Sequence, residues 1–177
     1  MILLSYHYEA DQPYKSITPT IDDTCFIAEN TSIIGDVTIG AGTSIWYGTT
    51  IRGDVNITRI GKDTNIQDGT VIHVATHGQG THIGDRVTVG HMAWLHDCTI
   101  EDEAYIGMQS CIMDGATVQS RAFVAAGSLG TPGKTIPNGQ LWGPRPAKYM
   151  RDLTDDDYEL IAWSWSHYKK VAAAHQK

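Results

Sequence analysis

Aliphatic residues recur every six positions along most of this chain, with a change of phase at three points. Two positions before each of them the side chain is small or β-branched, and glycine often follows. Such a period predicts a parallel β-helix, in which each hexapeptide forms one short strand and stacked coils bury a continuous core. The aliphatic positions are Ile27, Ile33, Ile39, Ile45, Ile51, Ile57, Ile60, Ile66, Ile72, Ile83, Val89, Leu95, Ile100, Ile106, Ile112, Val118 and Val124.

The repeat also sets the expected domain organisation. Three hexapeptides make one triangular coil of eighteen residues, so the seventeen aliphatic positions predict five to six coils. We expect one domain of four parts. Residues 1–26 form a lead-in that caps the first coil, and residues 27–130 form the β-helix. Residues 131–153 form a proline-rich extended crossover, and residues 154–175 form a helix.

The C-terminal segment has the signals of an amphipathic helix. Thr154 suits the N-cap position, and three aspartates follow it in the first turn, at the positive end of the helix dipole. We expect the apolar stripe of this helix to pack on a face of the chain's own coils. A bundle helix or a partner-binding helix is the alternative. The stripe consists of Tyr158, Ile161, Trp165, Tyr168 and Ala172.

The changes of phase indicate where the coil is interrupted. Ile72 and Ile83 lie eleven positions apart, which is one hexapeptide plus five extra residues. This polar, Gly-rich insertion, VATHGQGTH, is expected to project from a corner as a loop beside His73. The other two changes are an offset of three residues before Ile60 and the loss of one residue before Ile100.

Composition narrows the classes of function. The net charge of −7 and the lack of a Lys and Arg cluster oppose a nucleic-acid partner. The start, MILLSYHYEADQ, has a short apolar run and no basic region, so we expect neither a signal peptide nor a membrane-spanning helix, and we expect a cytoplasmic protein. The three cysteines form no CxxC pair, and Cys25 and Cys98 occupy small inward positions, which favours a packing role.

Three histidines are the strongest candidates for chemistry. His73 follows Ile72 and His96 follows Leu95, so both side chains should point outward. They are twenty-three positions apart, which equals one coil of eighteen plus the five-residue insertion. They should therefore stack on one face at about the 4.8 Å spacing of neighbouring strands, which suits two imidazoles on one metal ion. His91 belongs to the preceding hexapeptide and should lie one face away.

One chain is not expected to close this site. A six-residue face is up to about 20 Å long, whereas zinc needs its nitrogen ligands at about 2.0–2.1 Å. A second copy could bring its own His91 to the His73 and His96 pair of the first, and a cyclic trimer would repeat that contact three times. An outward histidine alone is more often a solvated side chain; the stacked pair with a third one face away favours a metal site.

Polar residues accompany the histidines. Arg52 should lie in the same column one coil below His73, and together with Asp54 it could form a charge-assisted pair at a subunit contact. An exposed ion pair of little effect is the alternative. Asn65 and Gln67 should lie beside His91, where their amides could orient water or substrate.

Several strings resemble one known family. IRGDV at 51–55, TNIQDG at 64–69, IH at 72–73, GHMAWLH at 90–96 and WGPRPAKYMRDLT at 142–154 are similar to the γ-class carbonic anhydrases and their close homologues. The resemblance covers nearly the whole chain and implies a left-handed β-helix with a C-terminal helix, assembled as a homotrimer with metal between subunits. The residues it implies are His73, His91 and His96 as ligands, Arg52 and Asp54 at the interface, and Gln67 and Asn65 around metal-bound water. In the family a tyrosine of the terminal helix also approaches the site, and Tyr168 is the nearest match here.

The sequence departs from the archaeal prototype of that family in its acidic residues. The prototype has glutamates after the Arg-x-Asp motif and in the loop after the first metal histidine. Here Val55 follows Asp54, and the insertion has no acid. His77 or His82 is the alternative group for proton transfer, because histidine titrates near neutral pH.

Three functions follow from these patterns. The leading hypothesis is a lyase that converts CO2 to bicarbonate with hydroxide formed on zinc, or on Fe²⁺ or Co²⁺. The second is an acyltransferase or thioesterase that acts on a CoA thioester with a catalytic histidine and no metal. The third is a non-catalytic metal-binding trimer. Metal analysis separates the second from the others, and a CO2 hydration assay separates the first from the third.

Overall fold

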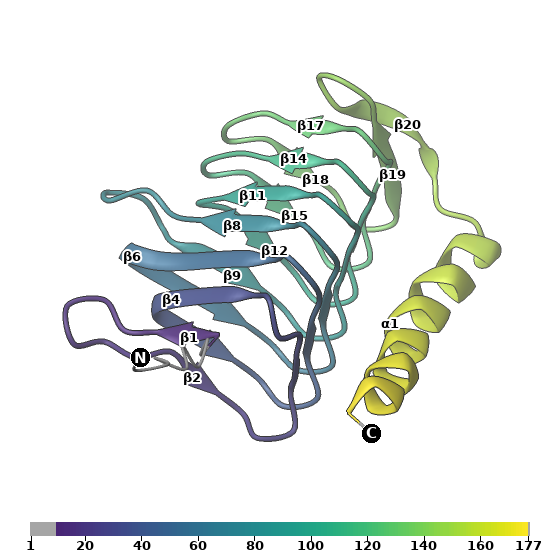
Figure 1. Cartoon of the computed structure of the whole chain (residues 1–177). Coiled ribbons are helices and arrows are strands. Elements are labelled where there is room, and N and C mark those ends of the chain that lie inside the picture. The colour runs from purple at the N-terminus through teal and green to yellow at the C-terminus, as the bar shows by residue number, and fades with distance from the viewer. Residues whose placement is uncertain (1–9, 177) are drawn as a thin grey trace, which may run out of the picture.

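A computed structural model describes residues 10–176, which form a parallel β-helix with one helix against its side (Figure 1). Each coil contributes one strand to each of three ladders, as the predicted hexapeptide period requires. The arrangement is consistent with the predicted left-handed β-helix. The first ladder consists of β1 (Asp11–Gln12), β4 (Ser32–Ile39), β6 (Thr50–Ile60), β8 (Val71–His73), β11 (Trp94–His96), β14 (Cys111–Ile112) and β17 (Leu129–Gly130).

The second ladder shares β4 and β6 with the first, because these two long strands continue around a corner. Its other members are β2 (Thr20–Ile21), β9 (Thr81–Ile83), β12 (Thr99–Ile100), β15 (Thr117–Val118) and β18 (Thr135–Ile136). The third ladder consists of β3 (Phe26–Ile27), β5 (Ser44–Ile45), β7 (Asn65–Ile66), β10 (Thr88–Val89), β13 (Tyr105–Ile106), β16 (Phe123–Val124), β19 (Gln140–Gly143) and the antiparallel β20 (Lys148–Asp152).

The predicted aliphatic positions form the core. Fifteen of the seventeen are buried, so the repeat identifies the inward side chains correctly in nearly every coil. They stack directly on one another, as Leu95 does between Ile72 and Ile112. Burial of apolar surface along this stack is the main stabilising contribution.

Ile57 is one of the two exceptions, and its assignment as a core position is wrong. In the structure Ile39 pairs with Ile60, twenty-one positions later, so this coil holds three residues more than the ideal eighteen. Ile57 lies in the extra segment and is only half-buried, and Val55, the expected small inward residue, is 41% exposed. The extra residues project at the corner between the first and second ladders.

All three changes of phase fall at this same corner. The segment before Thr58, the insertion after His73 and the shortened turn at Asp97 each connect a first-ladder strand to a second-ladder strand, on successive coils. The other two corners keep the hexapeptide step. Changes in chain length therefore leave the parallel registers of the ladders intact on either side.

The ladders continue beyond the predicted end of the coils at residue 130. β18 pairs in parallel with β15, and β19 pairs with β16, so part of the expected crossover, 131–153, extends the β-helix. The third ladder accordingly has seven parallel strands within residues 10–176, against the five to six coils expected. The prolines do not interrupt this extension, because they lie in turns or at strand ends.

The predicted C-terminal helix is present as α1 (Asp155–His175), and it packs against β5, β7 and β10 of the third ladder (Figure 1). Thr154 is the N-cap, and its side chain and that of Asp157 satisfy each other's backbone N–H groups in a capping box. Ile161, Ser164 and Ala172 are buried, so the helix covers the chain's own coils as expected. Within residues 10–176, no helix is long and apolar enough to span a membrane.

Candidate metal centre

His73 and His96 lie side by side on the first ladder. Their Cα atoms are register partners in β8 and β11, and their ring centroids are 5.3 Å apart. The side chains are 21% and 23% exposed, so each ring is partly sheltered and still reachable from outside the coil. The predicted outward stacking of these two imidazoles on adjacent coils is confirmed.

Arg52, Asp54 and His73 form a series of contacts between charged side chains and the imidazole. The guanidinium of Arg52 contacts the carboxylate of Asp54, and Asp54 Oδ1 lies 3.0 Å from His73 Nε2. Burial raises the pKa of Asp54, but the hydrogen bonds from Arg52 and His73 outweigh this effect and lower the pKa below its ordinary value. Asp54 is thus held as a carboxylate, and it orients both its cationic partner and the imidazole.

His96 has a different partner. Its Nδ1 lies 2.7 Å from Asp114 Oδ1, a carboxylate of the next coil. Nε2 is therefore the nitrogen of His96 turned away from the carboxylate. The rings of the pair are thus oriented through opposite nitrogens, because Asp54 contacts Nε2 of His73.

His91 lies at the other end of this face, next to the helix. It follows β10 of the third ladder, and its Nδ1 is 2.9 Å from Asp68 Oδ2. Tyr168 of α1 places its hydroxyl 3.5 Å from His91 Nε2. Burial and then the negative charge of Asp68 raise the pKa of Tyr168, so its hydroxyl stays protonated and can donate a hydrogen bond.

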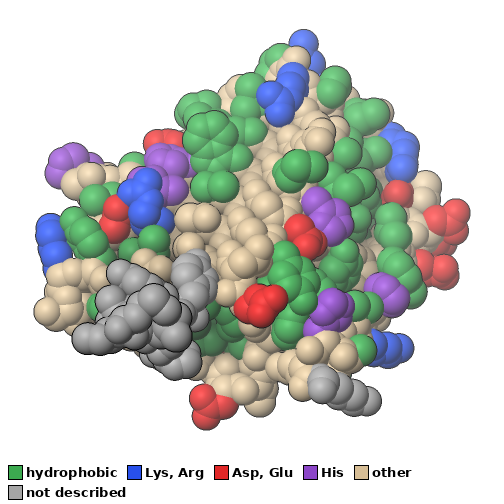
Figure 2. Space-filling view, viewed as in Figure 1, with side chains coloured by type: hydrophobic (Ala, Val, Ile, Leu, Met, Phe, Trp, Pro, Cys, Tyr) green, Lys and Arg blue, Asp and Glu red, His purple; other side chains and the backbone are tan. Residues whose placement is uncertain are grey.

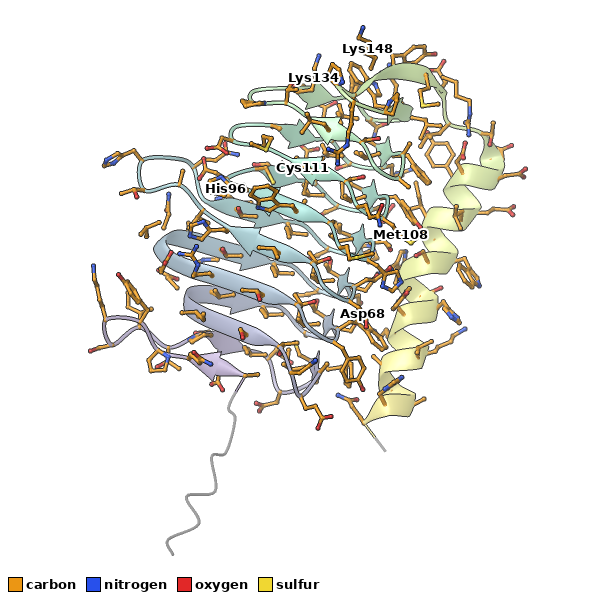
Figure 3. All side chains as sticks on the ribbon, turned by 45° about the horizontal axis from the view of Figure 1, so that its top comes forward. Asp68, His96, Met108, Cys111, Lys134 and Lys148 are labelled. Carbon is orange, nitrogen blue, oxygen red and sulfur yellow. The ribbon has the colours of Figure 1, made fainter. Side chains whose placement is uncertain are left out.

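The His73 and His96 pair is separated along this face from His91 and its partners Asp68 and Tyr168. Figure 3 shows Asp68 on the side of α1, whereas His96 lies toward the corner from which the loop projects. Within residues 10–176 of one chain, no three His, Cys, Asp or Glu side chains are grouped so that they could hold a metal ion. Within one chain, His91 is thus not grouped with His73 and His96.

Asn65 and Gln67 form a buried amide pair one coil below β10. Their exposed fractions are 1% and 5%. Gln67 Nε2 donates to Asn65 Oδ1 over 3.0 Å, and Asn65 Nδ2 in turn donates to Thr88 Oγ1 over 3.0 Å. These bonds fix the amide orientation, so the side-chain oxygen of Gln67 is the acceptor that remains.

The loop after His73 is anchored by a buried carboxylate. Asp97 is 3% exposed, and it accepts backbone N–H groups from Ala75, Gln79 and Gly80. A side chain at Gly78 would collide with this carboxylate, because an added Cβ would lie 1.9 Å from Oδ2. The Asp97 carboxylate therefore holds the backbone of the insertion in a defined conformation.

The two alternative proton-transfer residues lie apart from each other. His77 is exposed within the loop. His82 is on the second ladder, in register with Arg59 and Thr99, and its Nε2 contacts the carbonyl of Gln79. His82 therefore lies on a different face from the His73 and His96 pair, because the corner separates β8 from β9.

A hollow of about 460 Å³ adjoins the histidine pair and has an apolar rim. Val71, Met92 and Trp94 line it and are 42%, 58% and 51% exposed. Figure 2 shows hydrophobic side chains across the face in view, histidine side chains at both its left and its right, and scattered Lys and Arg. A patch of exposed apolar side chains rimmed by polar residues is typical of a surface that another protein covers.

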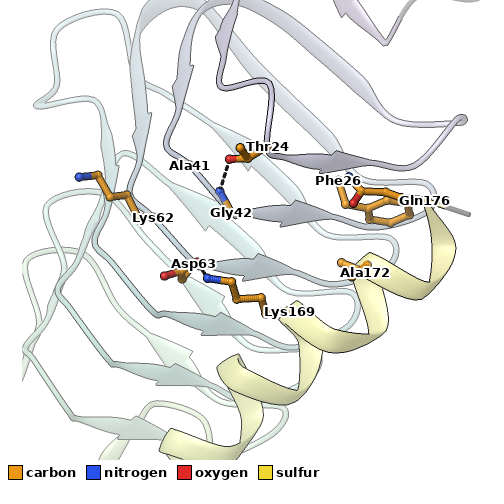
Figure 4. A pocket seen from close by; sticks show the side chains of 10 residues that line it. Thr24, Phe26, Ala41, Gly42, Lys62, Asp63, Lys169, Ala172 and Gln176 are labelled. Atoms are coloured by element: carbon orange, nitrogen blue, oxygen red, sulfur yellow. Dashed lines mark hydrogen bonds and ion pairs between the residues drawn. The ribbon is translucent and has the colours of Figure 1, made fainter.

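A second hollow lies where the end of α1 meets the first coils (Figure 4). Lys169 pairs there with Asp63 over 2.7 Å, and Gly42 donates its N–H to Thr24 Oγ1. No histidine is among the residues that line it. The paired histidines thus lie at the first hollow and not at this one.

The chain is similar in sequence to known proteins. Residues 18–53 match the family described as bacterial transferase hexapeptide (six repeats). The protein named Gamma carbonic anhydrase 2, mitochondrial, of Arabidopsis thaliana is 49% identical over 163 residues, which cover 89% of this chain and 59% of the relative. Carbonic anhydrase of Geobacillus kaustophilus is 49% identical over 146 residues, which cover 82% of this chain and 79% of the relative.

The chain belongs to the γ-class carbonic anhydrase family. It spans about three fifths of the length of the plant relative. A solved structure described as a hexapeptide transferase family protein from Anaplasma phagocytophilum has a TM-score of 0.91 and 44% identity, and covers 94% of this chain and 98% of its own. This γ-class chain therefore shares its whole described fold with a protein whose description names transfer rather than hydration.

Three carboxylates of this γ-class chain are absent from the candidates that the sequence provides. They are Asp68, Asp97 and Asp114, which contact His91, the loop and His96. Asp114 lies eighteen positions after His96, one ideal coil, so the coil length is the signal that could have found it. Asp68 lies twenty-three positions before His91, which is again one coil plus the insertion.

Proposed function

We propose that this chain is a γ-type carbonic anhydrase that reversibly hydrates CO2 to bicarbonate in a homotrimer. The metal would be shared by His73 and His96 of one chain and His91 of a neighbour. The observation that carries the proposal is the register pairing of His73 with His96, 5.3 Å between ring centroids, in a chain with γ-class relatives. The proposed location is the cytoplasm, although the plant relative is named as mitochondrial.

The donor set fits a divalent metal such as zinc, with Fe²⁺ or Co²⁺ as alternatives. Each of the three imidazoles has one nitrogen held by a carboxylate, and such carboxylate partners are usual for metal-binding histidines. The other nitrogen would be the metal ligand, and in His91 this is Nε2, which lies 3.5 Å from the Tyr168 hydroxyl. When bound, the metal supplies the Lewis acidity that brings the pKa of a water molecule from 15.7 toward about 7. Three neutral histidines with an open fourth position are a catalytic ligand set.

The chain's polar side chains would position the reactants. Gln67 is locked by its bond to Asn65, so its carbonyl oxygen can accept a hydrogen bond from water at a fixed place. Tyr168 is protonated and lies 3.5 Å from His91, where its hydroxyl can donate to a bicarbonate oxygen. Hydrogen-bonding groups held in place in this way stabilise the negative charge that develops as bicarbonate forms.

The apolar rim would act at the contact between chains. Trp94, Met92 and Val71 would be covered by the neighbouring chain, and their side chains would exclude bulk water around the imidazole pair. Arg52 is 43% exposed, so its guanidinium can also reach a second chain while it holds Asp54. The covering chain and the third ligand thus come from the same contact.

The test combines oligomeric state, metal content and turnover. We expect light scattering to report three chains, anaerobic metal analysis to find one metal per chain, and stopped-flow assays to detect CO2 hydration by the reduced, metallated protein. His91→Ala should lose both metal and activity, because two imidazoles remain. A stable monomer that keeps its metal, or a hydration rate no higher than that of buffer, would remove the proposal.

Acyl transfer from a CoA thioester is the second candidate. It is favoured by the hexapeptide transferase description of the Anaplasma phagocytophilum structure, which is 44% identical over nearly the whole chain. This reaction would need a catalytic histidine and no metal. Metal-free protein that consumes acetyl-CoA in the presence of an amine or alcohol acceptor, and loses that activity in a histidine variant, would favour transfer over hydration.

A further inference from the structure

Asp114 is held in place by the coils on both sides of it. Its carbonyl accepts the N–H of Gly133 from the coil above, and the next residue, Gly115, donates its N–H to the carbonyl of Asp97 from the coil below. Gly115 has a φ of +68°, which a glycine adopts without strain. The turn thus fixes the Asp114 backbone, and the carboxylate reaches His96 Nδ1 at 2.7 Å.

The neighbouring aspartate cannot take over this role. Asp97 follows His96 directly, but its carboxylate is buried and already accepts three backbone N–H groups of the loop. Asp114 is 46% exposed and contacts the imidazole. The two aspartates on consecutive coils therefore have separate tasks, one for the loop and one for the ring.

We infer that Asp114 is a positioning residue that fixes the proton of His96 on Nδ1 and so presents Nε2 as the metal ligand. A carboxylate at hydrogen-bond distance accepts N–H, so it favours the tautomer with hydrogen on the near nitrogen. The free Nε2 lone pair then points away from Asp114. This inference rests on the proposed function, because it assigns an atom of one proposed ligand.

The first arm of the test uses the metal-free protein, so it does not depend on the proposed function. Histidine-selective ¹⁵N NMR at alkaline pH, where imidazoles are neutral, should show His96 as the Nδ1–H tautomer. Asp114→Ala should shift His96 toward the Nε2–H form, whereas Asp114→Asn should keep part of the preference, since the amide oxygen still accepts a hydrogen bond. Asp23→Asn, which removes the same charge from an exposed turn between β2 and β3, should change nothing.

The second arm measures zinc affinity by competition with a chromophoric chelator. Loss of a second-layer partner typically weakens metal binding about 10- to 100-fold. We expect Asp114→Ala to fall in that range, Asp114→Asn to lie between it and the wild type, and Asp23→Asn to bind as the wild type does. Absorption spectra of the Co²⁺-loaded proteins should show a ligand field that is changed most in Asp114→Ala, less in Asp114→Asn and not at all in Asp23→Asn.

The outcomes separate the two ideas. If the wild-type chain binds no metal, the proposed function fails, and the tautomer measurement still decides the role of Asp114. If wild-type His96 is the Nε2–H tautomer, or if Asp114→Ala keeps both the tautomer and the wild-type zinc affinity, the inference is overturned. A shifted tautomer with weakened zinc binding supports it.

Discussion

Replacing Leu95 by alanine tests whether the core stack supports the histidine pair. Leu95 is 0% exposed and lies between Ile72 and Ile112 in the first ladder. Removing three buried carbons costs about 2.4 kcal/mol at roughly 0.8 kcal/mol each. The parallel strands above and below are held about 4.8 Å apart by backbone hydrogen bonds, so the cavity cannot close and the total should reach roughly 3–5 kcal/mol.

The assay is equilibrium urea unfolding followed by circular dichroism, at one protein concentration because assembly would make stability concentration-dependent. Leu160→Ala is the matched control: this leucine is 40% exposed on α1, and its loss should cost well under 1 kcal/mol. Because Leu95 precedes His96, Leu95→Ala should also weaken zinc binding. Equal unfolding free energies for the two variants would refute the stacked-core explanation.

Three further predictions concern assembly, proton transfer and the helix. Arg52→Ala should raise the concentration at which the trimer dissociates, measured by analytical ultracentrifugation, and unchanged dissociation would refute an interface role for the Arg52–Asp54 pair. If the absent acidic loop limits turnover, imidazole buffers should raise kcat with little effect on kcat/KM in stopped-flow assays; indifference of kcat to buffer would contradict this. Hydrogen bonds from Arg151 hold the pKa of Asp157 in the folded protein well below its ordinary value of about 3.9. The ionised Asp157 therefore stabilises the folded protein fully at pH values above about 3.9, and this stabilisation is lost as the pH falls through the lower pKa of the folded state. Asp157→Asn should therefore cost roughly 1 kcal/mol near neutral pH and progressively less in strong acid, by urea unfolding across pH; a cost independent of pH would argue against the ion pair.

The repeat could be predicted from the sequence because burial enforces it at nearly every coil. The error at Ile57 arose because Val55 and Ile57 reproduce the local spacing of an inward pair, although the chain there bulges outward at a corner. Only the pairing of Ile39 with Ile60 distinguishes the two registers, and that pairing depends on contacts between coils. The continuation past residue 130 was hidden for a similar reason, since Gly130 occupies the position of an aliphatic residue.

The candidate site was predictable in part. His73 and His96 follow inward residues on adjacent coils, so simple counting brings them together. The partners Asp68 and Asp114 lie at turns, where side-chain direction depends on the backbone conformation rather than on strand alternation. Their contacts with the histidines therefore needed the structure, as did the burial of Asp97 beneath the loop.

The confinement of every length change to one corner has an evolutionary consequence. Insertions and deletions there alter the chain beside His73 and His96 without moving the strands that carry the two rings. The other two corners keep the six-residue spacing, so the third ladder, on which α1 packs, keeps its register. A lineage can therefore lengthen, shorten or recharge the loop in single genetic steps, while the strands that carry His73 and His96 keep their register.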